Sequence, residues 1–402
     1  MYKNYIKYGW TCYYGSEKKK GVSKLMLTRK YYFVACAALL GILMILPLGC
    51  GPAEEVGDVE EEEVEEEEVE VEEEGIFIGG ELIADQELYA AAVEEGNLVF
   101  YTAHTLDHER AVVDAFETRF PEIEVDLTRA GGATLDERMK TEEQAGELKA
   151  DVVVNSDTNY IQEYYDLGWL LEHVPPAADM YPADAKREGY FYPTGASAIV
   201  IAYHTDLLDE EDAPVDWDCL SDERFAGRLG GQRLGGGAMW AMVAYLGDRG
   251  DLDIIHDWAV NEPIMHTSGA GLATSLVAGE FVATPMGLFA AYPQKYHRGA
   301  PLEIVWPESG FPLYIPSIAL LNHGENPNAA KLFMNWYMSA DGQSRLANAR
   351  GQFSLRDDVL PAPHLPPLDQ LNAEVVNPDV FLDADLRDQW VSETTRALGW
   401  ED

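Results

Sequence analysis

Strand and helix patterns alternate along residues 97–154, and this alternation is the strongest constraint on the fold. The first strand is an apolar run rich in strand formers, and Asp107 is the expected N-cap of the helix after it. The expected order is a strand over 97–102, a helix to about 119, a strand over 122–129, a helix over 134–147 and a strand over 151–154. Such a β-α-β-α-β run predicts a parallel sheet covered by helices, and so an α/β fold.

Polar residues and glycines follow each of these three strands. Ligands bind to such sheets at the carboxyl ends of the strands, where loops lead into helix N-termini. Backbone N–H groups at a helix start suit a carboxylate or a phosphate, although an ordinary turn explains the glycines nearly as well. The candidate ligand-binding residues here are His104, Thr105, Gly131, Gly132, Thr134, Ser156 and Asp157.

A second group of candidates lies between residues 197 and 292. The glycine-rich stretch 230–237 lacks the Gly-Lys-Ser/Thr of a P-loop, so we expect its glycines to allow close backbone approach to a ligand and not nucleotide hydrolysis. Aromatic side chains in this region either stack on a ligand or pack in the core. The candidates from this region are Ser197, Gly236, Trp240, Ser268, Phe289 and Tyr292.

The amino terminus has the pattern of a secretory leader. A basic cluster over residues 18–30 is followed by an uninterrupted apolar run over residues 31–48, and Cys50 comes directly after Gly49. Cys50 is therefore a candidate for lipidation, as in bacterial lipoproteins, while an uncleaved membrane anchor is the alternative. Both interpretations of residues 1–50 place the rest of the chain outside the cytoplasm, anchored to the cell membrane.

An acidic segment follows the leader. Residues 51–75 contain fifteen acidic residues and no basic ones. Blocks of like charge repel one another and stay extended, so we expect residues 51–80 to form a disordered tether. An acidic tail with no specific role is the alternative.

The remainder of the chain is also strongly acidic. It contains 20 basic and 55 acidic residues, within a net charge of −43 for the whole chain. Such a body repels nucleic acid, which we therefore exclude as a partner. Its negative potential favours cationic ligands, although global charge is a weak guide to one pocket.

Several motifs between Asn97 and Arg350 resemble, in order and spacing, the ferric-iron-binding-protein-like family of ABC transporter extracellular solute-binding proteins. They are Leu98–His104, Ala115–Glu117, Ala150–Val154, Gly168–Leu170, Gly299–Pro307, Ile315–Ala319, Asn326–Phe333 and Ser339–Gln343. The resemblance implies a two-lobed periplasmic binding protein type II fold with the ligand in the interlobe cleft. It implies one lobe from residues 83–196 plus 312–345 and another from residues 197–311 plus 346–402.

The iron ligands of this family are only partly matched. Iron-binding members carry an adjacent tyrosine pair eight or nine residues before the Gly-Ala-Pro motif, where this chain has Ala290 and Ala291. The nearest metal candidates are His104, Asp157 and Tyr292. Since the pair is broken, we expect a small organic solute such as an aminophosphonate, a polyamine or a thiamine-like compound, with ferric iron as the alternative and no resident cofactor.

Catalysis is not expected from this sequence. It contains neither a Gly-x-Ser-x-Gly elbow nor a His-Glu-x-x-His metal pair, although an extracytoplasmic hydrolase using carboxylates is a formal alternative. The resemblance instead implies a capture component that closes around its solute and delivers it to an ABC permease with its ATPase subunits.

Overall fold

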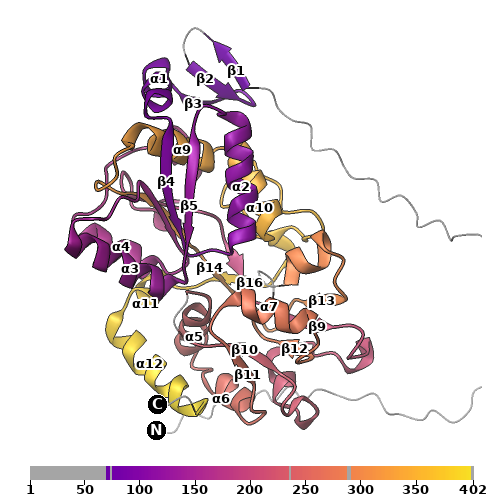
Figure 1. The fold of residues 1–402 in the computed structure, drawn as a ribbon. Helices are drawn as coiled ribbons and strands as arrows, with labels where there is room; N and C mark the ends of the chain where they lie inside the picture. The colour runs from indigo at the N-terminus through magenta and orange to yellow at the C-terminus, as the bar shows by residue number, and fades with distance from the viewer. Residues whose placement is uncertain (1–68, 73–74, 235–236, 288–290, 400–402) are drawn as a thin grey trace, which may run out of the picture. The chain divides into compact units, whose positions relative to one another are not determined.

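A five-stranded sheet forms the centre of the first lobe. The computed structural model describes residues 69–72, 75–234, 237–287 and 291–399. The strand order is β5-β4-β6-β15-β7, with β4 parallel to β5 and β6, and β15 antiparallel to β6 and β7. Figure 1 labels the neighbouring strands β4 and β5. The strands are β4 (Asn97–Thr102), β5 (Glu124–Arg129), β6 (Val152–Asn155), β7 (Phe191–Pro193) and β15 (Ser317–Leu320).

The β-α-β-α-β order expected for residues 97–154 is confirmed. Helix α2 (Leu106–Arg119) joins β4 to β5, and α3 (Gly132–Ala145) joins β5 to β6. The expected N-cap of α2 was wrong by two residues, because Thr105 has the extended backbone of an N-cap and Asp107 lies in the first turn. A carboxylate in the first turn is still favourable, since it faces the positive end of the helix dipole.

Helices cover both faces of this sheet. One face packs Phe100 of β4 against Phe116 of α2 and Phe333 of α9, and the other packs Val153 of β6 among side chains of α3 and α4. The covering helices are α1 (Gln86–Glu95), α9 (Pro327–Met338) and α10 (Ala340–Arg350) with α2 on one face, and α4 (Thr158–Asp166) with α3 on the other. Burial on both faces explains why the central strand β6 is a continuous apolar run, whereas the edge strand β5 alternates between apolar and polar residues.

A small antiparallel sheet precedes the first lobe's main sheet. It consists of β1 (Val69–Glu72), β2 (Gly75–Ile78) and β3 (Glu81–Ala84). Ile76 and Ile78 are buried in the same hydrophobic cluster as Ala92 of α1. Residues 75–78, which directly follow the acidic run, thus form strand β2, because Ile76 and Ile78 supply apolar surface to bury.

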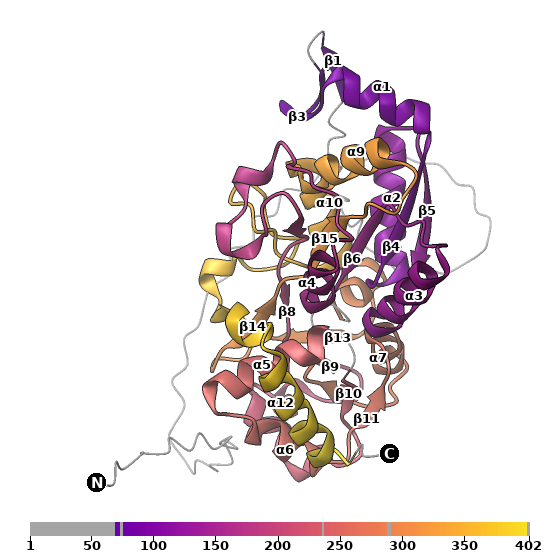
Figure 2. The same ribbon diagram turned by 90° about the vertical axis from the view of Figure 1, so that its left-hand side faces the viewer.

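The second lobe contains two small sheets with helices around them. Strand β9 (Ile201–His204) lies between β12 (Ala283–Thr284) and β13 (Leu302–Val305), and β10 (Gly230–Gln232) pairs in parallel with β11 (Ile264–His266). Figures 1 and 2 both show α12 beside α5 and α6, against which it packs. The helices are α5 (Gly237–Arg249), α6 (Asp253–Ala259), α7 (Gly269–Val277) and α12 (Ala384–Ala397).

The chain crosses between the lobes through a third set of strands. Strand β14 (Phe311–Tyr314) lies between β8 (Ser197–Ala198) and β16 (Ala373–Val375). Strand β7 continues into β8, β14 continues into β15, and Ala196 pairs with Phe353 just after α10. The two lobes are thus joined by several short segments, and the residue limits given for them above stay predictions.

Candidate functional site

A polar cleft of about 110 Å³ lies where strands of both lobes end and helices begin. Its described lining residues come from in and around the β4–α2, β5–α3 and β6–α4 connections and the end of α10 in the first lobe, and from β10, α5 and the start of α7 in the second. The crossing strands β8 and β14 contribute one residue each. They are Ala103, His104, Thr105, His108, Arg129, Gly131, Gly132, Ser156, Ser197, Gln232, Gly237, Ala238, Thr267, Ser268, Gly269, Ala270, Tyr314 and Arg350.

Three helix N-caps line this cleft. Thr105 caps α2, Gly131 caps α3 and Ser268 caps α7. No side chain caps α2 or α3, whereas the Ser268 hydroxyl accepts a hydrogen bond from the Gly271 N–H. First-turn N–H groups of a helix are positively polarised and have no intrahelical acceptor. The cleft therefore presents N–H donors to an acceptor placed within it.

The backbones of the two lobes lie close together between Gly237 and Ser156. A Cβ atom at Gly237 would lie 2.0 Å from the Ser156 carbonyl oxygen, so only glycine allows this contact. Within the first lobe, a Cβ atom at Gly132 would lie 3.0 Å from Oδ1 of Asn155, whose Nδ2 donates to the Gly132 carbonyl at 3.3 Å. These glycines let the backbone walls of the cleft approach each other.

Arg350, at the end of α10, is the buried cation of the cleft. Its Nη2 donates to Glu109 and, at 2.8 Å, to the hydroxyl of Tyr337. Its Nε and Nη1 have no hydrogen-bond partner, although the residue is 5% exposed. A buried donor without an acceptor costs free energy, so this guanidinium is suited to bind an acceptor that enters the cleft.

Arg129 supplies a second guanidinium at the end of β5. Its Nε donates to the His104 carbonyl at 2.9 Å, and partial burial lowers its pKa. No Asp or Glu is among the described residues that line the cleft. The cleft is thus locally cationic in a strongly acidic chain.

Burial and the charge of Arg350 shift the pKa values of three groups: His104, just before α2, and His108 and Glu109 in α2. Burial alone would raise the pKa of Glu109, but the charge of Arg350 lowers it to about 2. Burial and then Arg350 lower the pKa of His108 to about 4, and they lower that of His104 as well. Both imidazoles are therefore neutral at pH 7, while Glu109 and Arg350 are both charged.

The protein-family model described as bacterial extracellular solute-binding protein matches residues 111–367. The chain belongs to this family. A Haemophilus influenzae protein of uncharacterised function is 23% identical over 276 residues, which are 65% of this chain and 78% of that protein. A probable ABC transporter periplasmic-binding protein (y4fP) of Sinorhizobium fredii is 25% identical over 265 residues, or 63% and 73% of the two chains.

Solved structures share the fold of this solute-binding protein. Iron-bound HitA from Pseudomonas aeruginosa has a TM-score of 0.64 at 19% identity, covering 74% of this chain and 99% of HitA. AfuA from Actinobacillus pleuropneumoniae, with fructose-6-phosphate bound, has a TM-score of 0.67 at 21% identity, covering 76% of this chain and 100% of AfuA. The two-lobed type II fold and the family resemblance inferred from the sequence are confirmed.

The family assigns the broad function. This chain is the solute-binding component of an ABC importer, which acts outside the cytoplasm and has a small-molecule ligand and transporter partners. In the ranges that the structure describes, no helix combines the length and apolar character needed to cross a bilayer. The expected leader over residues 1–50 and its Cys50 lie outside those ranges.

Seven of the residues proposed from the sequence line the cleft of this solute-binding protein. They are His104, Thr105, Gly131, Gly132, Ser156, Ser197 and Ser268. Asp157 and Thr134 do not line it: Thr134 lies within α3, and Asp157 is buried as the N-cap of α4. Gly236 and Phe289 lie outside the described residues.

Two of the three proposed aromatic contacts, Trp240 and Tyr292, pack in the core of the second lobe. Trp240 is buried and its Nε1 donates to the Phe381 carbonyl at 2.9 Å. Tyr292 is buried and its hydroxyl donates to the Pro363 carbonyl at 2.7 Å. The ring of Tyr292 also lies against Gly351, just after Arg350. Both aromatics therefore use their polar atoms within the fold.

The metal candidates His104, Asp157 and Tyr292 do not come together. Only His104 lines the cleft, and no cluster of three or more His, Cys, Asp or Glu side chains suited to a metal occurs among the described residues. The sequence reasoning missed Arg129, Gln232, Tyr314 and Arg350. Arg129 directly follows a strand before two glycines, a signal that could have found it, whereas Arg350 belongs to a C-terminal helix far away in sequence.

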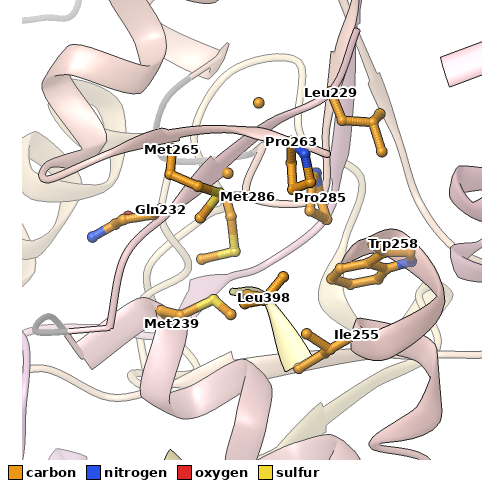
Figure 3. A pocket seen from close by; sticks show the side chains of 12 residues that line it. Leu229, Gln232, Met239, Ile255, Trp258, Pro263, Met265, Pro285, Met286 and Leu398 are labelled. Carbon is orange, nitrogen blue, oxygen red and sulfur yellow. The ribbon is translucent and has the colours of Figure 1, made fainter. Parts of the chain in front are cut away.

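Two other cavities are less suited to a polar solute. Figure 3 shows a cavity of about 20 Å³ lined by Met239, Trp258, Met265 and Met286, which has room for about one water. A groove of about 440 Å³, between α4, β7 and the segment 375–382, is lined mainly by apolar side chains. Tyr314 lines both this groove and the polar cleft. The described residues that line the groove include none of the N-caps of α2, α3 and α7.

Proposed function

We propose that this solute-binding protein captures a small organic solute, and not ferric iron, and delivers it to an ABC permease and its ATPase. The observation that carries this proposal is the composition of the cleft, where helix N-termini from both lobes meet without a carboxylate among the described lining residues. A solute there contacts both lobes, so its binding favours the closed arrangement. The proposal includes no resident cofactor.

The cleft is poorly matched to ferric iron. Ferric iron is a hard ion that needs several anionic oxygen ligands. Tyr314 is the one tyrosine among the described lining residues, and burial raises its pKa to about 12. Its phenol is therefore protonated at pH 7. Similar structures include iron-bound HitA and AfuA with fructose-6-phosphate, so the decision between metal and organic solute rests on the lining residues.

Thermal unfolding of residues 69–402 with single added solutes tests this proposal. The panel is ferric citrate, 2-aminoethylphosphonate, putrescine and thiamine. We expect an organic compound to raise the Tm and ferric citrate to leave it unchanged, because a ligand at 100 times its Kd stabilises the native state by about 2.7 kcal/mol. Stabilisation by ferric citrate alone, with a visible tyrosinate charge-transfer band, contradicts the proposal.

Membrane attachment through the amino terminus is a second part of the proposal. Cys50 follows an apolar run that resembles a lipoprotein leader, and an uncleaved anchor over residues 31–48 is the alternative. Expression of the full chain in a bacterium with a labelled fatty acid distinguishes them. If Cys50 is lipidated, the full chain carries the labelled fatty acid and the Cys50→Ala variant does not. Membrane-bound, unlabelled chain indicates the uncleaved anchor, and a fully soluble chain contradicts attachment.

A further inference from the structure

We propose that the solute carries a doubly charged phosphoryl group, as a phosphate monoester or a phosphonate, and that Arg350 is its principal counter-ion. This inference rests on the proposed capture of an organic solute in the polar cleft. It narrows the expected solutes to anions and excludes polyamines and thiamine-like cations.

The hydrogen-bonding state of Arg350 is the first argument. Glu109 and Tyr337 occupy Nη2, which holds the guanidinium in place, while the buried Nε and Nη1 stay without acceptors. Because Arg350 lines the cleft, a solute bound in the cleft can supply the acceptors that its Nε and Nη1 lack. Arginine binds phosphoryl oxygens with strong, charge-assisted hydrogen bonds.

The helix N-termini are the second, independent argument. Helices α2 and α3 each have 14 residues, begin at the cleft, and lack a side-chain cap. Helix α7 brings a third N-terminus from the opposite lobe. Several N–H donors converging from different directions match the three terminal oxygens of a phosphoryl group better than the two oxygens of one carboxylate.

The charge balance is the third argument. Arg129 and Arg350 contribute two positive charges, and Glu109 behind Arg350 offsets one of them. The N-termini of α2, α3 and α7 add about half a positive charge each. His104 and His108 contribute none at pH 7. The remaining positive charge of about 2.5 is large enough to balance a phosphoryl dianion, which predominates at pH 7 because the second pKa of such groups is about 6.

This local charge is opposite to that of the whole chain. The chain carries 71 acidic and 28 basic residues, yet the described lining of the cleft contains two arginines and no carboxylate. A cationic solute would have to bind beside two guanidinium groups, with no carboxylate in the described lining. The net acidic charge of the whole chain therefore does not predict the charge of the solute that this cleft binds.

Calorimetric titration of residues 69–402 tests the inference. The probes are glycerol 3-phosphate, 2-aminoethylphosphonate, inorganic phosphate, succinate, putrescine and thiamine, each to about 10 mM, a concentration that detects even weak binding. We expect a monoester or phosphonate to bind, and inorganic phosphate to compete for the same cleft. Binding of putrescine, thiamine or succinate without phosphoryl binding overturns the inference and leaves the capture of an organic solute standing. The inference is also overturned if none of glycerol 3-phosphate, 2-aminoethylphosphonate and inorganic phosphate binds.

Variants of the two arginines test the assigned residues. Arg350→Gln should weaken binding of the phosphoryl probe by about tenfold to a hundredfold, as expected for lost hydrogen bonds to a charged group. Because Arg350→Gln leaves Glu109 buried without its partner, the double variant E109Q/R350Q removes both charges together. Arg129→Gln tests the second guanidinium without breaking a buried ion pair.

The matched control is Arg249→Gln, which removes the same charge from an exposed ion pair with Glu374 at the far end of α5. It should bind the probe as the parent protein does. Unchanged affinity in both E109Q/R350Q and Arg129→Gln contradicts the assignment of the cleft arginines.

Discussion

Arg387 of α12 donates from Nη2 to Oδ2 of Asp157 across 2.6 Å, and so ties the C-terminal helix of the second lobe to the N-cap of α4 in the first. Asp157 is fully buried, and its other oxygen accepts from the backbone and side-chain nitrogens of Asn159. Asn159 in turn donates to the Phe381 carbonyl at 3.1 Å. The proposed ligand residue Asp157 is therefore part of an interlobe contact beside the cleft.

Removing Arg387 should destabilise the protein and the closed arrangement together. Arg387→Gln leaves the buried Asp157 carboxylate without its ion pair, which costs about 3 kcal/mol. Urea unfolding measures this loss, and small-angle scattering with the ligand checks closure. The control is Arg249→Gln at an exposed pair, where we expect a loss below about 1 kcal/mol. Equal losses in the two variants would show that the Arg387 contact has no special role.

Gly237→Ala should hinder the approach of the lobes without harming α5. The added Cβ would lie 2.0 Å from the Ser156 carbonyl oxygen, whereas alanine is favoured over glycine within a helix. We expect ligand affinity to fall at least about tenfold, with unfolding of the ligand-free protein changed by less than about 1 kcal/mol. In the control Gly271→Ala the nearest atom is 3.4 Å away. Retention of full affinity by Gly237→Ala would mean that closure does not bring these residues together.

Stability should decrease on acidification in two steps. The folded pKa of His108 is about 4 against an ordinary 6.5, so the unfolded chain binds more protons between these values and stability is lost as pH falls from about 6.5 to 4. The folded pKa of Glu109 is about 2 against 4.5, so its contribution is present above 4.5 and is lost as pH falls toward 2.

Urea unfolding between pH 7 and pH 4 measures the first step. A shift of this size corresponds to a loss of about 3 kcal/mol at most, and His108→Asn should remove that part of the slope. The remaining slope includes His104, whose pKa burial and Arg350 also lower. An unchanged slope in His108→Asn would show that this imidazole is not buried in its neutral form.

Tyr292 and Tyr314 should respond differently to loss of their hydroxyl groups. Tyr292→Phe removes a buried hydrogen bond to the Pro363 carbonyl, so we expect a loss of about 1 kcal/mol in unfolding free energy and unchanged ligand affinity. Tyr314→Phe changes a residue that lines the cleft, so it should weaken binding. Loss of binding in Tyr292→Phe with an intact fold would restore the sequence-based assignment of Tyr292 to the site.

The first lobe illustrates what can be predicted from local sequence. Strands β4 and β6 are apolar runs and β5 alternates between apolar and polar residues, with helical patterns between them, so period and turn residues alone locate these strands. The cleft residues His104, Gly131 and Ser156 follow from the same reasoning, because in a parallel sheet the residues after each strand meet at one edge.

The misplaced candidates share a physical cause. A side chain such as that of Trp240, Tyr292 or Asp157 can pack in a core, cap a helix or contact a ligand. Sequence spacing does not show in which direction the side chain points. Packing decided this, because Trp240 of α5 packs against Phe381 of α11 (Pro378–Phe381) and Arg387 of α12, and Arg387 also pairs with Asp157.

The sequence by itself therefore determined the α/β class of the first lobe and the edge of the sheet where the candidate site lies, since both depend on local periodicity and on chain order. The two-lobed arrangement was implied by the family resemblance. Only the tertiary structure decided the charge of the site. Arg350 enters the cleft from α10, 241 positions after its partner Glu109, and its unpaired donors depend on contacts between segments far apart in the chain. Composition, which is strongly acidic, indicates the opposite sign because it averages over a surface that the ligand never contacts.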